Sequence, residues 1–99
     1  MTTKQEQVLM HLYRQHGNET EFEMPFETTQ DGIAEAIGMG RAHVSIELKR
    51  LEEKGLVYHL KRHAYRDGCL NRQLRRCYRL NPAGVRMACE LLQTAGEVA

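Results

Sequence analysis

The sequence predicts an α+β fold: a three-helix core with a short edge strand, a two-stranded β-hairpin and a C-terminal helix. Apolar residues recur at helical spacing in much of the first half of the chain, and at every second position in two stretches between residues 56 and 80. The only two prolines, Pro25 and Pro82, lie beside expected element boundaries. With 99 residues, the chain is expected to form a single domain, residues 1–99, around one core.

The first helix is expected at about residues 4–16. Thr2 or Thr3 can cap its first N–H groups, and Gly17 can supply the left-handed turn that ends it. Its apolar face consists of Val8, Leu9, Leu12 and Tyr13.

A short strand is expected within residues 18–28, where apolar residues alternate with glutamates. Phe22, Met24 and Phe26 would form its buried face. Pro25 has no N–H to donate to a neighbouring strand, so this strand is expected at the edge of the sheet.

The second helix is expected to open at Thr28 and Thr29. Thr28 and Asp31 have the spacing of a capping box, although Asp is the less usual partner. Gly38 ends this helix. Its apolar face consists of Ile33, Ala34 and Ile37.

The third helix follows a tight turn made by Met39 and Gly40. It is expected to run from about Arg41 to Lys54, and Gly55 ends it. Its buried stripe consists of Val44, Leu48 and Leu51.

The change of period to two indicates a hairpin, with its turn at Asp67 and Gly68. Asn81 then caps a last helix, and Pro82 occupies its first position, where a missing N–H costs nothing. The alternating residues are Leu56, Tyr58 and Leu60 in the first strand, and Leu74, Tyr78 and Leu80 in the second. The last helix would bury Val85, Ala88, Leu91 and Leu92.

Two helices joined by a short turn and followed by a two-stranded hairpin make a winged helix-turn-helix. Ala34 is small enough for the two helices to touch where they cross. Gly38 provides the sharp turn, and Met39 fills the space beneath it.

Three segments in this order resemble the winged helix-turn-helix regulators of the MarR-like type, over about residues 29–92. The segments are residues 29–45, 48–57 and 78–84, the last with Asn81 where the family has Thr. The resemblance implies a transcription regulator that binds DNA. Gly40 replaces the usual Ser or Thr cap, the hairpin lacks the family's full Asp-x-Arg pattern, and the long dimerising helices are short or absent. The Arg-rich strand before Tyr78 also resembles archaeal winged-helix heads of longer signalling proteins.

The net charge of +1 conceals an asymmetry along the chain. Residues 1–40 contain two basic and seven acidic residues, whereas residues 41–86 contain twelve basic and four acidic residues. A basic stretch in a small domain favours an anionic partner, and a solvated charged face is the alternative.

The third helix carries the expected base contacts, on the face away from its buried stripe. Arg41 can read guanine O6 and N7, and Ile46 and Ala42 can touch thymine methyl groups. His43 and Ser45 can bond bases or phosphates. The predicted set is Arg41, Ala42, His43, Ser45, Ile46, Lys49 and Arg50.

The hairpin carries the expected phosphate contacts. Its basic residues would repel one another unless an anion lay nearby, and a duplex backbone is such an anion. Arg66 or Arg72 at the tip can enter the minor groove. The predicted set is Lys61, Arg62, Arg66, Arg72 and Arg75.

No metal, cofactor or catalytic site is expected. The hairpin contains His59, His63, Cys69 and Cys77, but their spacing fits no zinc pattern and strand alternation would separate them. No catalytic triad order, phosphate loop or paired carboxylates occur. An odd number of cysteines and the lack of a signal peptide or membrane span predict a cytoplasmic protein.

The sequence therefore predicts sequence-specific binding of double-stranded DNA by a transcription regulator that is not an enzyme. The alternative is a winged-helix module that docks another protein, or the N-terminal head of a larger signalling chain. A homodimer built from the first and last helices is expected, because Leu91, Leu92 and Val98 leave apolar surface there.

Overall fold

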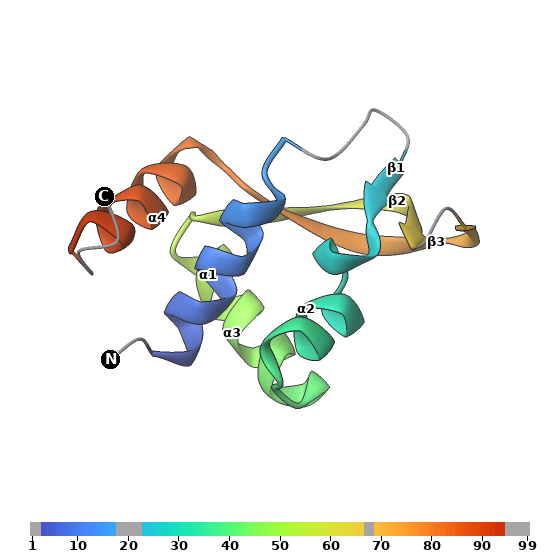
Figure 1. The fold of residues 1–99 in the computed structure, drawn as a ribbon, viewed down its shortest axis with the longest axis horizontal. Coiled ribbons are helices and arrows are strands. Elements are labelled where there is room, and N and C mark those ends of the chain that lie inside the picture. Colours follow the sequence, from blue (N-terminus) through green and yellow to red (C-terminus); the bar gives the residue numbers. More distant parts are fainter. Residues whose placement is uncertain (1–2, 18–22, 67–68, 95–99) are drawn as a thin grey trace.

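The computed structural model describes residues 3–17, 23–66 and 69–94, which form four α-helices, one 3₁₀ helix and a three-stranded sheet (Figure 1). In chain order these are α1 (Lys4–Gln15), β1 (Glu23–Pro25), the 3₁₀ helix (Phe26–Thr28), α2 (Gln30–Ile37), α3 (Arg41–Glu53), β2 (Val57–Arg66), β3 (Cys69–Leu80) and α4 (Pro82–Thr94). The predicted winged helix-turn-helix fold is confirmed.

Helix α1 lies at the centre and contacts α2, α3, α4 and β3, while α4 lies at the end of the sheet away from the hairpin turn (Figure 1). The predicted apolar faces of α1, α2 and α3 meet in one main core. Of the predicted face of α4, Ala88 is buried in this core, Val85 and Leu91 are half-buried against it, and Leu92 is half-buried outside it, since α4 packs at the end of the sheet. That core consists of Val8, Leu9, Leu12, Ile33, Ala34, Met39, Val44, Leu48, Leu51, Val57, Tyr78, Leu80 and Ala88.

The helix boundaries follow the predicted capping residues closely. Thr3 caps α1, because its hydroxyl accepts the Glu6 N–H at 3.1 Å and its own N–H donates to the Glu6 carboxylate at 2.9 Å. Gly17, Gly38 and Gly55 have φ values of 93°, 67° and 71°, where a residue with a Cβ is strained. The predicted glycine stops are therefore confirmed.

The start of α2 packs directly on the 3₁₀ helix. A Cβ added at Gly32 would lie 2.0 Å from the carbonyl oxygen of Phe26. Only glycine allows this approach, which fixes α2 against the segment that precedes it.

Side-chain hydrogen bonds of Asn81 fix the first turn of α4 to the residue Gly55, which follows the end of α3. Asn81 Oδ1 accepts the Gly84 N–H at 2.9 Å, as its predicted capping role requires, and Asn81 Nδ2 donates to the Gly55 carbonyl oxygen. None of the helices in the described ranges has the length and apolar character needed to cross a membrane.

The sheet has the order β1-β2-β3. Strand β1 lies at its edge, as Pro25 predicted, and runs parallel to β2 with Met24 opposite Ala64. Strands β2 and β3 are antiparallel, from Val57 opposite Leu80 to the hairpin end, and their register shifts between His63 and Tyr65.

Two predictions about the segment before α2 are wrong. Phe26 lies in the 3₁₀ helix, not in the strand, because the chain turns after Pro25. Thr29, not Thr28, caps α2: its hydroxyl accepts the Gly32 N–H at 3.1 Å. The Thr28 hydroxyl instead donates to the Pro25 carbonyl oxygen at 2.7 Å, so the predicted Thr28–Asp31 capping box does not form. Phe22 lies outside the described residues.

The predicted buried phase of the hairpin is also partly wrong. Tyr58 and Leu74 are 36% and 58% exposed, whereas Val57 is buried. The main hydrophobic core packs against the hairpin only near Val57, Tyr78 and Leu80, so burial does not alternate along the whole strands. Farther along, a second small cluster of Met24, Ala64 and Cys77 provides the packing. The predicted turn at residues 67–68 lies outside the described residues.

Candidate nucleic-acid interface

Helix α3 presents one face to the core and another to solvent. Val44, Leu48 and Leu51 are buried, as predicted. The predicted base-contacting side chains all lie on the exposed part of the helix. They are Arg41, Ala42, His43, Ser45, Ile46, Lys49 and Arg50.

The first residue of α3 is held by the first turn of α2. Gly40, the N-cap of α3, provides no side-chain hydrogen bond. Instead, Gln30 Nε2 donates to the Arg41 carbonyl oxygen at 2.9 Å, and Arg41 Nε forms an ion pair with Asp31 Oδ1. The start of α3 is therefore positioned by side chains of the preceding helix.

Asp31 also connects α3 to the hairpin. Its other carboxylate oxygen, Oδ2, accepts a hydrogen bond from Arg75 Nη1 at 3.0 Å. A pocket of about 180 Å³ lies at this junction, lined by Thr29, Gln30, Asp31, Arg41, Arg75 and Arg76. Three guanidinium groups against one carboxylate leave the pocket with a net positive charge, which suits an anionic ligand.

The register of the hairpin places like charges opposite one another. Lys61 is paired with Arg76, and Arg62 with Arg75. Directly opposite like charges destabilise a sheet. Asp31 offsets the charge of Arg75, and bound phosphates would offset the charge of this stretch further.

Arg66 lies against α2 and does not extend away from the hairpin as a tip residue would. Its Nη1 and Nη2 bond the two carboxylate oxygens of Glu35, at 3.2 and 2.5 Å. Its guanidinium also lies over the Phe26 ring, 4.7 Å from the ring centroid. The predicted insertion of Arg66 into a minor groove would require these contacts to break. Arg72 lies in β3, but its side chain is outside the described part of the structure.

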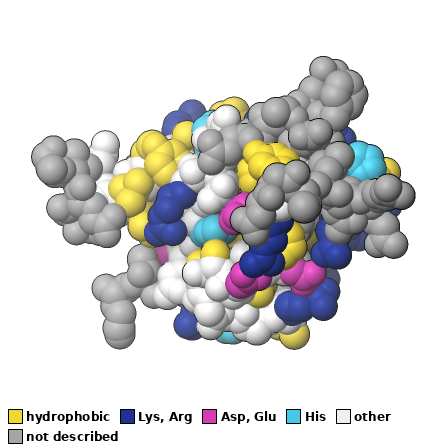
Figure 2. Space-filling model, turned by 45° about the vertical axis from the view of Figure 1, so that its right-hand side comes forward, with side chains coloured by type: hydrophobic (Ala, Val, Ile, Leu, Met, Phe, Trp, Pro, Cys, Tyr) yellow, Lys and Arg dark blue, Asp and Glu magenta, His cyan; other side chains and the backbone are white. Residues whose placement is uncertain are grey.

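The basic residues are consequently mixed with acidic ones. Figure 2 shows Lys and Arg side chains next to Asp and Glu side chains on one face of the molecule. On α3, the Arg50 guanidinium likewise pairs with Glu47 at 3.0 Å. The candidate interface is therefore less positive than the count of basic residues in the sequence suggested.

Sequence reasoning missed the polar residues Gln30, Asp31 and Glu47 as members of this site, and its set of phosphate contacts left out Arg76 of the same basic hairpin. Glu47 is only 4% exposed, and its spacing of three residues from Val44 was a signal for burial on the same helix face. The contacts of Asp31 with Arg75 join residues far apart in the sequence, and no local pattern announces them.

Two of the four hairpin residues considered as metal ligands have other environments, and the Cys69 side chain lies outside the described part of the structure. His59 Nδ1 lies 3.0 Å from Glu52 Oε2. Cys77 is buried, and this burial raises the pKa of its thiol. Among the described residues, no three His, Cys, Asp or Glu side chains come together as a candidate metal site.

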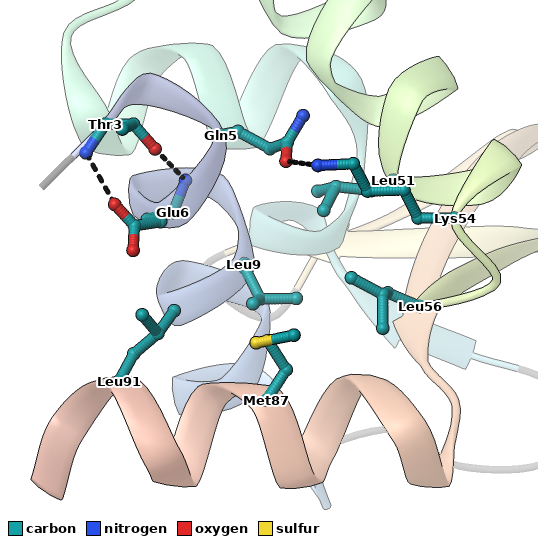
Figure 3. A pocket seen from close by; sticks show the side chains of 9 residues that line it. All are labelled: Thr3, Gln5, Glu6, Leu9, Leu51, Lys54, Leu56, Met87 and Leu91. Atoms are coloured by element: carbon teal, nitrogen blue, oxygen red, sulfur yellow. Dashed lines mark hydrogen bonds between the residues drawn. The ribbon is translucent and has the colours of Figure 1, made fainter. Parts of the chain in front are cut away.

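A second surface lies between α1, the end of α3 and α4. It contains a pocket of about 330 Å³ whose apolar lining includes Leu9, Leu51, Leu56, Met87 and Leu91 (Figure 3). Polar groups lie along one side, where Lys54 Nζ donates to Gln5 Oε1 at 2.6 Å.

A winged helix-turn-helix domain with an exposed third helix and a basic hairpin is thus the class that the fold and the site define. The chain belongs to the family of Crp-like helix-turn-helix domains, whose model matches residues 6–77. No curated protein shows significant sequence similarity to it.

Solved structures of MepR from Staphylococcus aureus have the same fold. A MepR mutant from a multidrug-resistant clinical isolate gives a TM-score of 0.70 at 23% identity, over 98% of this chain and 59% of that one. A second mutant gives 0.68 at 26% identity, over 98% and 60%. A MepR–DNA complex gives 0.68 at 24% identity, over 98% and 58%. The chain spans about three fifths of the length of these proteins.

Proposed function

We propose that the chain binds double-stranded DNA in a sequence-specific manner, as part of a transcription regulator of the MarR-like type. One observation carries the proposal: the face of α3 opposite Val44, Leu48 and Leu51 is exposed along its length, beside a basic hairpin. An α-helix fits the major groove, where each base pair has a distinct pattern of donors and acceptors.

The roles within the interface follow from this placement. The exposed side chains of α3 provide the base contacts, and Arg41 at the helix start is the foremost of them. The hairpin provides contacts to phosphates through Lys61, Arg62 and Arg75. Support comes from the three sequence segments of the MarR-like type and from the MepR structures, one of which is a DNA complex. The comparisons give no support to an archaeal head domain.

The proposal is tested by selection from a random oligonucleotide library, followed by binding measurements on the enriched and a scrambled duplex. We expect an enriched sequence that binds at least about 1,000-fold more tightly than the scrambled duplex. If the enriched sequence is a palindrome, it also indicates a dimer and gives the spacing of its half-sites. A library without enrichment at low and physiological salt would refute sequence-specific binding.

A second candidate function is that of a winged-helix module that docks another protein, or another domain of a longer chain. The observation in its favour is that Arg41, Arg66 and Arg75 already have carboxylate partners in the protein. A basic surface neutralised in this way has less attraction for phosphates. Binding to no duplex at about 50 mM salt, where phosphate contacts are strongest, would favour this function over the first.

We also propose a homodimer formed through α1 and α4. These helices contribute to the apolar pocket of Figure 3, which the exposed Met87 and the half-buried Leu91 line; Leu92 of the same helix is also half-buried. Val98 lies outside the described residues. Light scattering at tens of micromolar should give twice the chain mass, and a monomer mass with and without DNA would refute the dimer. A cytoplasmic location and the absence of catalysis, metal and cofactor stay predictions.

A further inference from the structure

We propose that Asp31 of α2 is a positioning residue, which holds the Arg41 side chain of α3 in the orientation that reads a base pair. The inference rests on the DNA-binding function proposed above. The two carboxylate oxygens of Asp31 have different partners: Oδ1 pairs with Arg41 Nε, and Oδ2 accepts a hydrogen bond from Arg75 Nη1. One side chain thus connects the start of α3 with the hairpin.

The main chain of Arg41 is fixed by Gln30, which precedes Asp31 in the first turn of α2. Gln30 Nε2 bonds the Arg41 carbonyl oxygen at 2.9 Å. Consecutive residues of α2, Gln30 and Asp31, therefore hold the backbone and the side chain of Arg41. They do so where α3 has no capping side chain, because its N-cap is Gly40.

The ion pair leaves the base-reading edge of Arg41 available. A guanidinium has five N–H donors, one on Nε and four on the two Nη atoms. Asp31 faces Nε, so both Nη atoms stay available for the O6 and N7 acceptors of a guanine. The Arg41 side chain is 71% exposed and the Asp31 side chain 31%, which places the guanidinium on the solvent side of the pair.

The charge of Asp31 has opposite effects on two kinds of binding. Holding a long arginine side chain in place before binding removes part of the ordering cost of a specific contact. The same carboxylate repels phosphates, and this repulsion lowers the affinity for every duplex alike. The Arg41 side of the ion pair is 71% exposed, and such exposure limits what the pair contributes to folding stability. Asp31 therefore favours the specific complex over the non-specific one.

The test measures binding of the wild type and Asp31→Asn to the enriched and the scrambled duplex, at one salt concentration. We expect the ratio of the two affinities to fall roughly two- to twelvefold in the variant, which corresponds to releasing one long side chain. The affinity for the scrambled duplex should rise, because a negative charge is lost. In the Arg41→Ala background, Asp31→Asn should leave the ratio unchanged, since Asp31 acts through Arg41.

The matched control is Glu35→Gln, which removes the same charge one helical turn later and releases Arg66 in place of Arg41. It should raise the affinity for the scrambled duplex and leave the ratio unchanged. ¹⁵N NMR relaxation of the free protein should show a restrained Arg41 Nε–H group in the wild type and in Glu35→Gln, and a mobile one in Asp31→Asn.

Three results would overturn the inference. An unchanged ratio in Asp31→Asn, with specific binding by the wild type, would reduce Asp31 to a repulsive charge. If the ratio falls but Asp31→Asn and Asp31→Ala also lose the folded state in thermal unfolding, the role of Asp31 is structural. A wild type without preference for any duplex refutes the proposed function and this role together, and the NMR relaxation then still reports whether the ion pair forms.

Discussion

Replacing Gly32 with alanine should destabilise the fold strongly, and the close approach of α2 to the 3₁₀ helix gives the magnitude. The new methyl carbon would lie 2.0 Å from Phe26 O, 2.7 Å from Phe26 C and 2.8 Å from Glu27 Cα, all of them backbone atoms. Ordinary contact begins at 3.4 Å, so the two segments must separate by about 1.4 Å. Overpacking typically costs about 1–3 kcal/mol, and the gain in helix propensity returns at most about 1 kcal/mol.

Because no flexible side chain can give way, we expect the upper end of this range, a net loss of about 2 kcal/mol in the free energy of unfolding. In a domain of this size such a loss lowers Tm by about 8–16 °C. Circular dichroism during thermal and urea unfolding measures both quantities. The matched control is Gly40→Ala, since a Cβ at Gly40 meets no atom within 4 Å and its φ is −65°. The control should stay within about 1 kcal/mol of the wild type, because lower chain entropy in the unfolded state offsets a poorer N-cap. Equal stability of both variants and the wild type would refute the close packing of α2 on the 3₁₀ helix.

Three further predictions concern binding and pH. Arg41→Ala should cost roughly 1–3 kcal/mol on the enriched duplex and much less on a scrambled one; equal losses would make Arg41 a phosphate contact. Lys61→Ala should reduce the slope of log K against log salt by about 0.9 on every duplex, and Arg66→Ala should reduce it less, because that guanidinium already has a carboxylate partner. Identical changes in slope would contradict the ion pair. His11 Nε2 lies 2.8 Å from the Glu27 carbonyl oxygen, and burial lowers the pKa of the His11 imidazole. As the pH falls, the imidazole is therefore protonated in the unfolded chain before it is protonated in the folded one. The free energy of unfolding should consequently decrease below about pH 6.5. In urea titrations, His11→Gln should flatten this decline, whereas His16→Gln, at the exposed C-cap of α1, should not. A decline equally steep in His11→Gln would assign it to other groups.

Local chemistry explains which parts of the fold were predictable. Gly17, Gly38 and Gly55 end the helices where expected, because a left-handed residue at a helix end is a requirement of the backbone alone. The cap at Thr29 was displaced by one position from Thr28, since both threonines have the same capping chemistry and only the 3₁₀ helix decides between them.

The hairpin was less predictable because its burial depends on other elements. A strand pattern indicates which residues share a face, but not how far along the strand another element covers that face. The main core packs against the hairpin near Val57, Tyr78 and Leu80, and a small cluster of Met24, Ala64 and Cys77 lies farther along. Leu74 belongs to neither cluster and is exposed although it keeps the apolar period.

The candidate interface, too, was predictable from the sequence only in part. The exposed face of α3 followed from the spacing of the buried Val44, Leu48 and Leu51, whereas the acidic partners of the arginines could not be predicted from spacing. Asp31 and Glu35 are one helical turn apart on α2, and each pairs with an arginine of the hairpin that is distant in sequence. Counting charges along the chain therefore identified the basic segment but overstated its free positive charge.

The parallel pairing of β1 with the far half of β2 has a mechanical consequence for the proposed DNA recognition. One end of the hairpin joins α3 and α4, and the other is tied through β1 to the segment that leads into α2. A further bridge connects Thr29, the cap of α2, with Cys77 in β3. The hairpin is thus held at two points, and these contacts restrain its distance from α3. A duplex held by both would have to adapt its own groove width and bend to this spacing. Base steps that the protein never touches, such as easily deformed TA steps, should then influence the affinity.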